Sequence, residues 1–372
     1  MRILQLMSCQ GWSSDAYWAA RVTRELERRG HDATLGCRTG TETRVIERAR
    51  REGVRRAITF RFAGGVDPVA DAADVRRLVK AFREADVVHV HRGKEHWLAA
   101  VANRVSSTPR PVVRTRHITQ PVRPHAANRW LYRRATRLVV TVTEGIRRQY
   151  IASGLVDPAA VVALPGGADV ETFHPARADD AIRRRLGASP DVVLVGMVAG
   201  FRMMKGHSVV VEAAARLAAA QRPVHFVFVG RGAVETSIQE RIGRAGLGDR
   251  LTIAGFVDDL PAVMAALDVA LYVPLESDGM SRVVFECLAA GRALVASRVG
   301  VVAEVLEDGA HAMLVPAGDA AALADAIDRL AADPALRARI GSAGRRHVEA
   351  HYSGAQIAAA LERHYLGFLG AA

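Results

Sequence analysis

Residues 269–297 read VALYVPLESDGMSRVVFECLAAGRALVAS. The opening apolar run predicts a buried strand over 269–273. An acidic loop follows, and a helix is expected to begin near Met280 and Ser281. A second apolar run predicts another strand over 294–297. This strand–helix–strand order is typical of a parallel sheet that is covered by helices.

Two carboxylates, Asp278 and Glu286, lie eight positions apart in this segment. Asp278 is at the expected mouth of the helix, and Glu286 is about 7 Å along the axis from Ser281. Backbone N–H groups at a helix N-terminus suit a phosphate, and carboxylates accept hydrogen bonds from sugar hydroxyls. Two interpretations stay open here: a site for a phosphate-bearing, polyhydroxylated ligand, or a strand–helix unit with a solvated acidic loop.

The same alternation extends over the whole chain and predicts an α/β fold with two doubly wound, Rossmann-like domains facing a central cleft. A turn-rich stretch between Leu164 and Ala176 interrupts it once. We therefore expect domains over 1–175 and 176–350, and a C-terminal helix in 351–372 that can pack back on the first domain. The candidate strands are 3–7, 33–37, 57–61, 87–91, 112–116, 138–143, 161–164, 192–199, 225–229, 251–254, 269–273, 294–297 and 312–315.

The net charge of +12 comes from the N-terminal half of the chain. Up to Pro175 there are 30 lysine and arginine residues against 17 acidic residues. Such an excess suits an anionic membrane surface or an anionic acceptor, or it reflects solvated helix faces in an arginine-rich chain. No basic, aromatic-interleaved patch supports nucleic-acid binding.

Three scattered cysteines make neither a disulfide framework nor a zinc cluster, which favours the cytosol. No window approaches the ~18 apolar residues of a membrane span. We expect a cytoplasmic protein that can be peripheral at the inner face of the plasma membrane.

The second domain opens with a buried strand and the loop Phe201–His207, FRMMKGH. Arg202 and Lys205 project from this loop just before a helix. Arginine binds phosphate in bidentate fashion and lysine offers a mobile point charge. Together with the acidic segment, these two cations predict a clamp for a diphosphate.

These residues resemble those of the retaining GT-B-fold glycosyltransferases of family 4, over essentially the whole chain. Four blocks carry the resemblance: the loop after the first strand (8–15), the loop 201–207, residues 255–259 and the segment 278–291. The resemblance implies a GT-B fold and a nucleoside diphosphate sugar as the donor substrate, with no cofactor.

The resemblance also implies roles for individual residues. Arg202 and Lys205 would neutralise the diphosphate, Asp278 would contact the donor sugar and Glu286 the ribose. His117, at the end of a first-domain strand, would lie near the transferred sugar. The remaining donor-binding candidates are Gly11, Gly255, Val257, Gly279, Met280 and Ser281.

Two positions depart from the family pattern. The first carboxylate is Asp278 in place of glutamate, which shortens its reach by one methylene. The family's arginine usually lies five residues before the lysine, where this chain has Gly200, and we assign its role to Arg202.

His89 and His91 share one face of a strand. A metal site there lacks a third ligand. Because Arg202 and Lys205 would already neutralise the phosphates, we expect a metal-independent enzyme. His89 is interpreted as a core histidine, and His91 and Trp12 as acceptor-side residues.

The predicted function is transfer of a sugar from the nucleotide sugar to a hydroxyl of a glycan or lipid-linked, lipopolysaccharide-type acceptor. The alternatives are a non-catalytic nucleotide-sugar-binding protein and a GT-B nucleotide-sugar epimerase. The motifs specify neither the donor sugar nor the acceptor.

Overall fold

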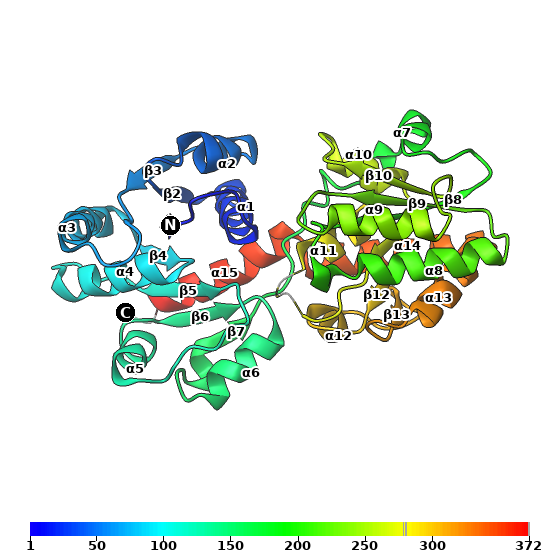
Figure 1. Ribbon diagram of the computed structural model, residues 1–372. Helices are drawn as coiled ribbons and strands as arrows, with labels where there is room; N and C mark the ends of the chain where they lie inside the picture. Colours follow the sequence, from blue (N-terminus) through cyan, green and yellow to red (C-terminus); the bar gives the residue numbers. More distant parts are fainter. Residues whose placement is uncertain (278, 280, 371–372) are drawn as a thin grey trace. The chain divides into compact units, whose positions relative to one another are not determined.

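The computed structural model describes residues 1–277, 279 and 281–370, and these divide into two compact units (Figure 1). The first comprises residues 1–167 together with the chain from Gly354 onward. The second comprises Ala168–Ser353. The C-terminal helix thus belongs to the same unit as the N-terminal sheet.

The first unit contains, in its described residues, a parallel sheet of seven strands in the order β3-β2-β1-β4-β5-β6-β7. The strands are β1 (Arg2–Leu6), β2 (Asp32–Arg38), β3 (Ala57–Phe60), β4 (Val87–Val90), β5 (Val112–Arg116), β6 (Leu138–Thr141) and β7 (Val161–Ala163). Most of their interior positions are apolar because helices cover both faces, with buried polar exceptions that include Gln5, His89 and Thr115.

Helices on the two faces of this sheet enclose two separate apolar clusters. The helices are α1 (Ser14–Arg28), α2 (Glu47–Arg51), α3 (Pro68–Glu84), α4 (Gly93–Val105), α5 (Ala126–Arg133), α6 (Glu144–Ala152) and α15 (Gly354–Leu369). The last helix, red in Figure 1, packs against α1. Glu362 accepts a hydrogen bond from Arg29 and pairs with His31 at 2.8 Å, which ties α15 to the start of the chain.

The second unit has a parallel sheet of six strands among its described residues, in the order β10-β9-β8-β11-β12-β13. The strands are β8 (Val193–Val198), β9 (Val224–Val229), β10 (Leu251–Gly255), β11 (Val269–Tyr272), β12 (Ala293–Ser297) and β13 (Met313–Val315). The helices are α7 (Asp180–Arg185), α8 (His207–Ala219), α9 (Glu235–Arg244), α10 (Leu260–Ala266), α11 (Arg282–Ala289), α12 (Val301–Val305), α13 (Ala320–Ala332) and α14 (Pro334–His351).

Side-chain caps explain where several of these helices begin. The carboxylate of Asp67 accepts a hydrogen bond from Ala70 N at 3.0 Å at the start of α3. Asp319 and Asp333 cap α13 and α14 in the same way, and Pro334 follows at the first helical position of α14. Each cap satisfies N–H groups that the helix itself cannot pair, so local sequence sets the start.

Both sheets have a point where the strand order reverses, between β1 and β4 in the first unit and between β8 and β11 in the second. Ligands of open α/β sheets bind outside the carboxyl ends of the strands at such switch points. The structure confirms the predicted α/β class with two doubly wound, Rossmann-like domains.

Candidate functional site

The loops that follow β8 and β11 are joined at the switch point of the second sheet. The N–H of Leu275 donates a hydrogen bond to the carbonyl oxygen of Met204 at 2.8 Å. Met204 lies between Arg202 and Lys205, in a 3₁₀ turn over Met203–Lys205. The fold therefore brings the two predicted cations beside the acidic segment, although some 70 residues separate them in the sequence.

Glycine at position 206 is what lets these loops approach so closely. Gly206 has φ +82°, and a Cβ there would lie 2.0 Å from the carbonyl oxygen of Val273. No side chain fits that space, and the left-handed backbone favours glycine as well. The turn leaves Arg202 exposed and Lys205 half-buried, so both cations sit at the rim of the sheet.

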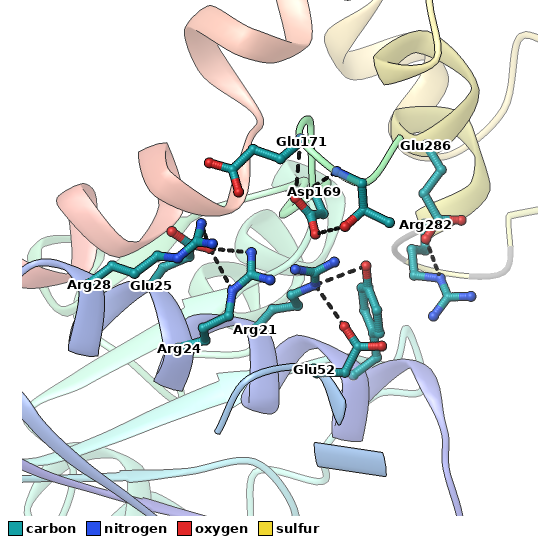
Figure 2. Close-up of polar contacts among 11 residues, drawn as sticks. Arg21, Arg24, Glu25, Arg28, Glu52, Asp169, Glu171, Arg282 and Glu286 are labelled. Carbon is teal, nitrogen blue, oxygen red and sulfur yellow. Dashed lines mark hydrogen bonds and ion pairs between the residues drawn. The ribbon is translucent and has the colours of Figure 1, made fainter. Parts of the chain in front are cut away.

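Glu286 lies inside the first turns of α11, as predicted, and its side chain is only 1% exposed. Its Oε1 forms an ion pair with Nε of Arg282, one turn earlier, at 2.9 Å (Figure 2). Arg282 is itself partly exposed. A ligand hydroxyl that binds this carboxylate must therefore share it with Arg282.

The turn into α11 carries the remaining predicted donor contacts. Ser281 has φ +50° and ψ +54°, a left-handed conformation that is uncommon for a residue with a side chain. The hydroxyl of Tyr272, at the end of β11, bonds to the Ser281 hydroxyl and braces this turn. Gly279 is buried with φ +93°. Asp278 and Met280 lie outside the described residues.

The next strands along the edge, β9 and β10, carry the predicted Gly255 and Val257 and add two residues that motif reasoning missed, Phe256 and Arg231. Gly255 ends β10 with φ +65°, and Val257 is half-buried beyond it. Between them Phe256 is 75% exposed. Arg231, which follows β9, is exposed, and its guanidinium lies 3.3 Å from where a Cβ on Gly255 would be. The run Val229–Gly232, VGRG, directly after a predicted strand, was the available signal for a third cation.

In the first unit, Gly11 and Trp12 lie in the loop after β1, at the switch point of that sheet. A Cβ on Gly11 would meet nothing within 4 Å, so the backbone itself does not demand glycine there. Trp12 is half-buried and meets the ring of Tyr17 edge-on, with centroids 6.4 Å apart.

His91 and His117 follow the neighbouring strands β4 and β5, and their rings meet. Nδ1 of His91 lies 3.2 Å from Nε2 of His117. His91 is 2% exposed and its other nitrogen pairs with Gln5 at 2.7 Å, so it can act on a ligand only through His117. His89 is fully buried, with both ring nitrogens hydrogen-bonded, which agrees with a core histidine.

A partly buried ion pair lies at this end of the first sheet. Arg92, after β4, donates to the carboxylate of Asp15 at the start of α1. Burial alone would raise the pKa of Asp15, but hydrogen bonds from Arg92 and Ser13 and the nearby His117 outweigh it and lower that pKa to about 2. The loop after β1 is therefore held against β4 at neutral pH.

Among the described residues, no three histidine, cysteine, aspartate or glutamate side chains gather in an arrangement that could hold a metal ion. None of the helices in the described part of the chain combines the length and apolarity that a bilayer span requires.

Comparison with known families places both units in one enzyme class. Residues 178–347 match the family described as glycosyl transferases group 1, and residues 16–172 match glycosyltransferase family 4. Together the two matches cover most of both sheets.

Three relatives illustrate the range of this class. Alpha-D-kanosaminyltransferase of Streptomyces kanamyceticus is 31% identical over 65% of this chain, which spans 63% of that relative's length. The lipopolysaccharide core biosynthesis mannosyltransferase LpcC of Rhizobium leguminosarum bv. viciae is 30% identical over 78% of this chain and 80% of its own. The phosphatidyl-myo-inositol mannosyltransferase of Mycobacterium leprae is 30% identical over 83% of this chain and 82% of its own.

Solved structures with the same fold extend over both units. Anabaena Alr3699/HepE in complex with UDP superposes with a TM-score of 0.83 and 20% identity, covering 99% of this chain and all of the other. A glycosyltransferase from Rickettsia africae ESF-5 gives a TM-score of 0.86 with 19% identity, covering 99% of this chain and 98% of the other. At these identities the likeness shows a shared GT-B fold.

Proposed function

The chain belongs to the group 1 glycosyltransferases of family 4. From that premise we propose that it moves a sugar from a nucleoside diphosphate sugar to a hydroxyl of a glycan or lipid-linked, lipopolysaccharide-type acceptor. We propose that the transferred sugar retains its anomeric configuration. That it is a glycosyltransferase follows from its family. The donor, the acceptor and the stereochemistry are the proposal.

The observation that carries the proposal is the hydrogen bond from Leu275 N to Met204 O at the switch point between β8 and β11. It puts two cations next to a helix N-terminus and a buried carboxylate, which are the groups that a nucleoside diphosphate needs. Structures of Anabaena Alr3699/HepE with UDP and with UDP-glucose support a donor of this class.

Each residue of this edge then has a role. Lys205 and Arg202 neutralise the diphosphate, with the amides near Gly279 and Ser281 at the mouth of α11. Glu286 accepts from the ribose. Gly255 and Val257 border the base, and the exposed ring of Phe256 offers it a stacking surface. Asp278 is proposed for the donor sugar, as the family pattern implies, and Met280 for the diphosphate.

Departure of the diphosphate is the demanding step, because negative charge builds on the leaving group while the sugar becomes oxocarbenium-like. Fixed cations and helix amides stabilise that charge more than they stabilise the intact donor. Here the chain's own cations supply this charge, so the proposed reaction needs no cofactor and no metal. Retention by attack from the same face as the leaving group is inherited from the family.

An anionic or lipid-linked acceptor is supported by a basic face on the first unit that carries the exposed ring of Trp130. It is formed around α5 by exposed residues, Ile118, Arg123, Arg129, Trp130, Arg133 and Arg134. Tryptophan with flanking arginines is typical of surfaces that rest on a membrane. We call this the α5 face, and propose that it rests on the inner leaflet of the plasma membrane from the cytoplasmic side, while nucleic acid is not a partner.

Vesicle binding tests the α5 face. The protein should sediment with phosphatidylglycerol vesicles and release as salt rises, because surface charges are screened. Replacing Arg129 and Arg133 with glutamate should abolish this binding, whereas Arg241→Glu on α9 of the second unit should not. Salt-insensitive binding, or equal binding by both variants, would contradict the proposal that the α5 face binds an anionic membrane.

The donor is tested by thermal shift with UDP-, GDP- and ADP-sugars. A donor at 100 times its Kd should add about 2.7 kcal/mol to the stability of the protein. Product analysis by NMR with the stabilising donor should then show transfer with retained anomeric configuration. If no nucleotide sugar stabilises the protein, the proposed donor class is wrong.

A further inference from the structure

Five polar side chains line one face of the first sheet at the ends of β1, β4 and β5. They are Gln5, His89, His91, Thr115 and His117. The register pairs Gln5 directly with His89, and the ring of Trp18 on α1 meets all three imidazoles with centroids 5.4 to 6.0 Å apart. Such packing fixes the positions of the rings. The tautomer of each imidazole is therefore determined by its hydrogen bonds.

The hydrogen bonds form two branches, which meet where the Gln5 amide bonds to the Tyr365 hydroxyl. In one, Gln5 Oε1 pairs with His91 Nε2 at 2.7 Å, and His91 Nδ1 pairs with His117 Nε2 at 3.2 Å. In the other, His89 pairs with Thr115 and with Tyr365 of α15, each at 2.6 Å. Only the first branch reaches His117.

Burial keeps these imidazoles neutral. It lowers the pKa of His91 well below its usual value, and nearby His89, His117 and Arg114 lower it further. Burial also lowers the pKa of His117 to about 3, against the opposing influence of Asp15. A neutral imidazole carries one N–H and one bare nitrogen. The nitrogen that carries the proton in one ring therefore determines which nitrogen carries it in the next ring of the branch.

The proton positions follow from Gln5. A carbonyl oxygen only accepts, so the proton of His91 is on Nε2 and its Nδ1 is bare. That bare nitrogen accepts from Nε2–H of His117, which leaves His117 Nδ1 bare as well. His117 Nδ1 is buried and has no hydrogen-bond partner among the described residues. A buried acceptor without a donor costs free energy until a ligand supplies one.

We propose that Gln5 is a positioning residue: through His91 it holds the proton of His117 on Nε2, so that His117 Nδ1 remains an acceptor for a substrate hydroxyl. This inference rests on the proposed function, because that hydroxyl belongs to the transferred sugar of the donor. With its pKa near 3, His117 is too weak a base to deprotonate the hydroxyl at neutral pH, so it orients and selects it. Ligands that offer only an acceptor at that position are rejected.

The first test reads the proton positions without any substrate. Nitrogen-15 NMR of the full-length protein distinguishes a bare imidazole nitrogen from a protonated one. We expect bare Nδ1 and protonated Nε2 on both His91 and His117 at pH 7. A Gln5 amide turned the other way would donate to His91 and reverse every proton in the branch, so a protonated His117 Nδ1 would overturn the inference.

Matched variants separate the branch from general packing. Gln5→Leu removes the acceptor and should shift His117 toward the tautomer with Nδ1 protonated. Thr115→Val breaks a bond of similar burial in the other branch and should leave the His117 tautomer unchanged. If both variants fold, by thermal unfolding, and neither changes the tautomer, Gln5 does not control it. If Gln5→Leu fails to fold, the wild-type NMR result alone decides.

The functional test uses the nucleotide sugar that the thermal-shift screen selects, and analogues in which each sugar hydroxyl in turn is replaced by fluorine, which cannot donate. In the wild type one analogue should lose about ten- to a hundredfold in kcat/KM. Gln5→Leu should shrink that loss to a few-fold, and Thr115→Val should keep it. Uniform losses for all analogues would overturn the inference. Turnover of no nucleotide sugar at all would instead overturn the proposed function and leave the tautomer assignment standing.

Discussion

Leu275 donates its backbone N–H to the carbonyl oxygen of Met204 at 2.8 Å, and this bond ties the acidic loop after β11 to the cationic loop after β8. Because β8 and β11 are neighbours in the sheet, the loops that follow them are adjacent, and their backbones can bond without any side chain. The side chains around it are thereby presented together at the place where the sheet leaves room for a ligand.

Gly206→Ala should disrupt this junction. The new Cβ would meet the carbonyl oxygen of Val273 at 2.0 Å in a left-handed backbone. We expect a loss of about 1–3 kcal/mol in the free energy of unfolding, and weaker binding of UDP because Lys205 moves. Chemical unfolding and calorimetry measure the two effects.

Gly243→Ala is the matched control for that variant. Gly243 lies inside α9 and a Cβ there would meet nothing within 4 Å. Alanine should raise stability by about 0.5–1 kcal/mol and leave UDP binding unchanged. Equal effects of the two substitutions would show that the junction does not depend on the space at Gly206.

Arg231→Ala should weaken binding of a nucleoside diphosphate by roughly three- to tenfold, since an exposed cation is partly screened by solvent. Arg231 follows β9 and lies beside Gly255 at the same sheet edge as Arg202. Arg241→Ala, on the surface of α9, should have no effect in the same titration. Unchanged affinity in Arg231→Ala would remove this residue from the diphosphate site.

Tyr365→Phe should loosen the C-terminal helix from the first unit. Its hydroxyl pairs with Nδ1 of the buried His89 at 2.6 Å, and removal leaves that nitrogen without its partner. We expect a loss of about 1–3 kcal/mol in unfolding free energy. Tyr352→Phe, at a half-buried tyrosine of the second unit, should cost less, and a reversed order of the two losses would contradict this role for α15.

Acid should destabilise the protein partly through His117. Burial lowers the pKa of His117 from 6.5 to about 3, so between these values the unfolded chain binds a proton that the folded chain does not. Stability therefore falls as pH falls through 6.5, by about 2 kcal/mol for this ring at pH 5. Urea unfolding of His117→Gln should show a pH slope smaller by about one proton, and an unchanged slope would contradict the assignment.

Much of the fold was predictable because each buried strand is a short apolar run. The expected strands at 87–91 and 112–116 correspond to β4 (Val87–Val90) and β5 (Val112–Arg116). The order of the strands was not predictable, because no local sequence pattern indicates that β4 pairs with β1. It follows from how the crossover helices wind, and only the folded chain shows it.

The same limit applies to the site. Arg202 and Lys205 could be proposed because charged residues after a buried strand are conspicuous in sequence, and Glu286 because of its spacing from Asp278. Arg231 sits in a short glycine-flanked turn that by itself indicates only a turn. The contact of Gln5 with His91 joins positions 86 residues apart. The tautomer of His117 depends on which way the Gln5 amide is turned, and sequence patterns do not encode that orientation.

The most direct test of the account compares UDP and uridine in calorimetric titrations of the wild type and Lys205→Ala. If the loop after β8 binds the diphosphate, the substitution should weaken UDP about ten- to a hundredfold and leave uridine unchanged, with the unfolding temperature preserved. Equal losses for both ligands, or no loss for UDP in the folded variant, would contradict the central claim that this loop holds the diphosphate of a nucleotide sugar.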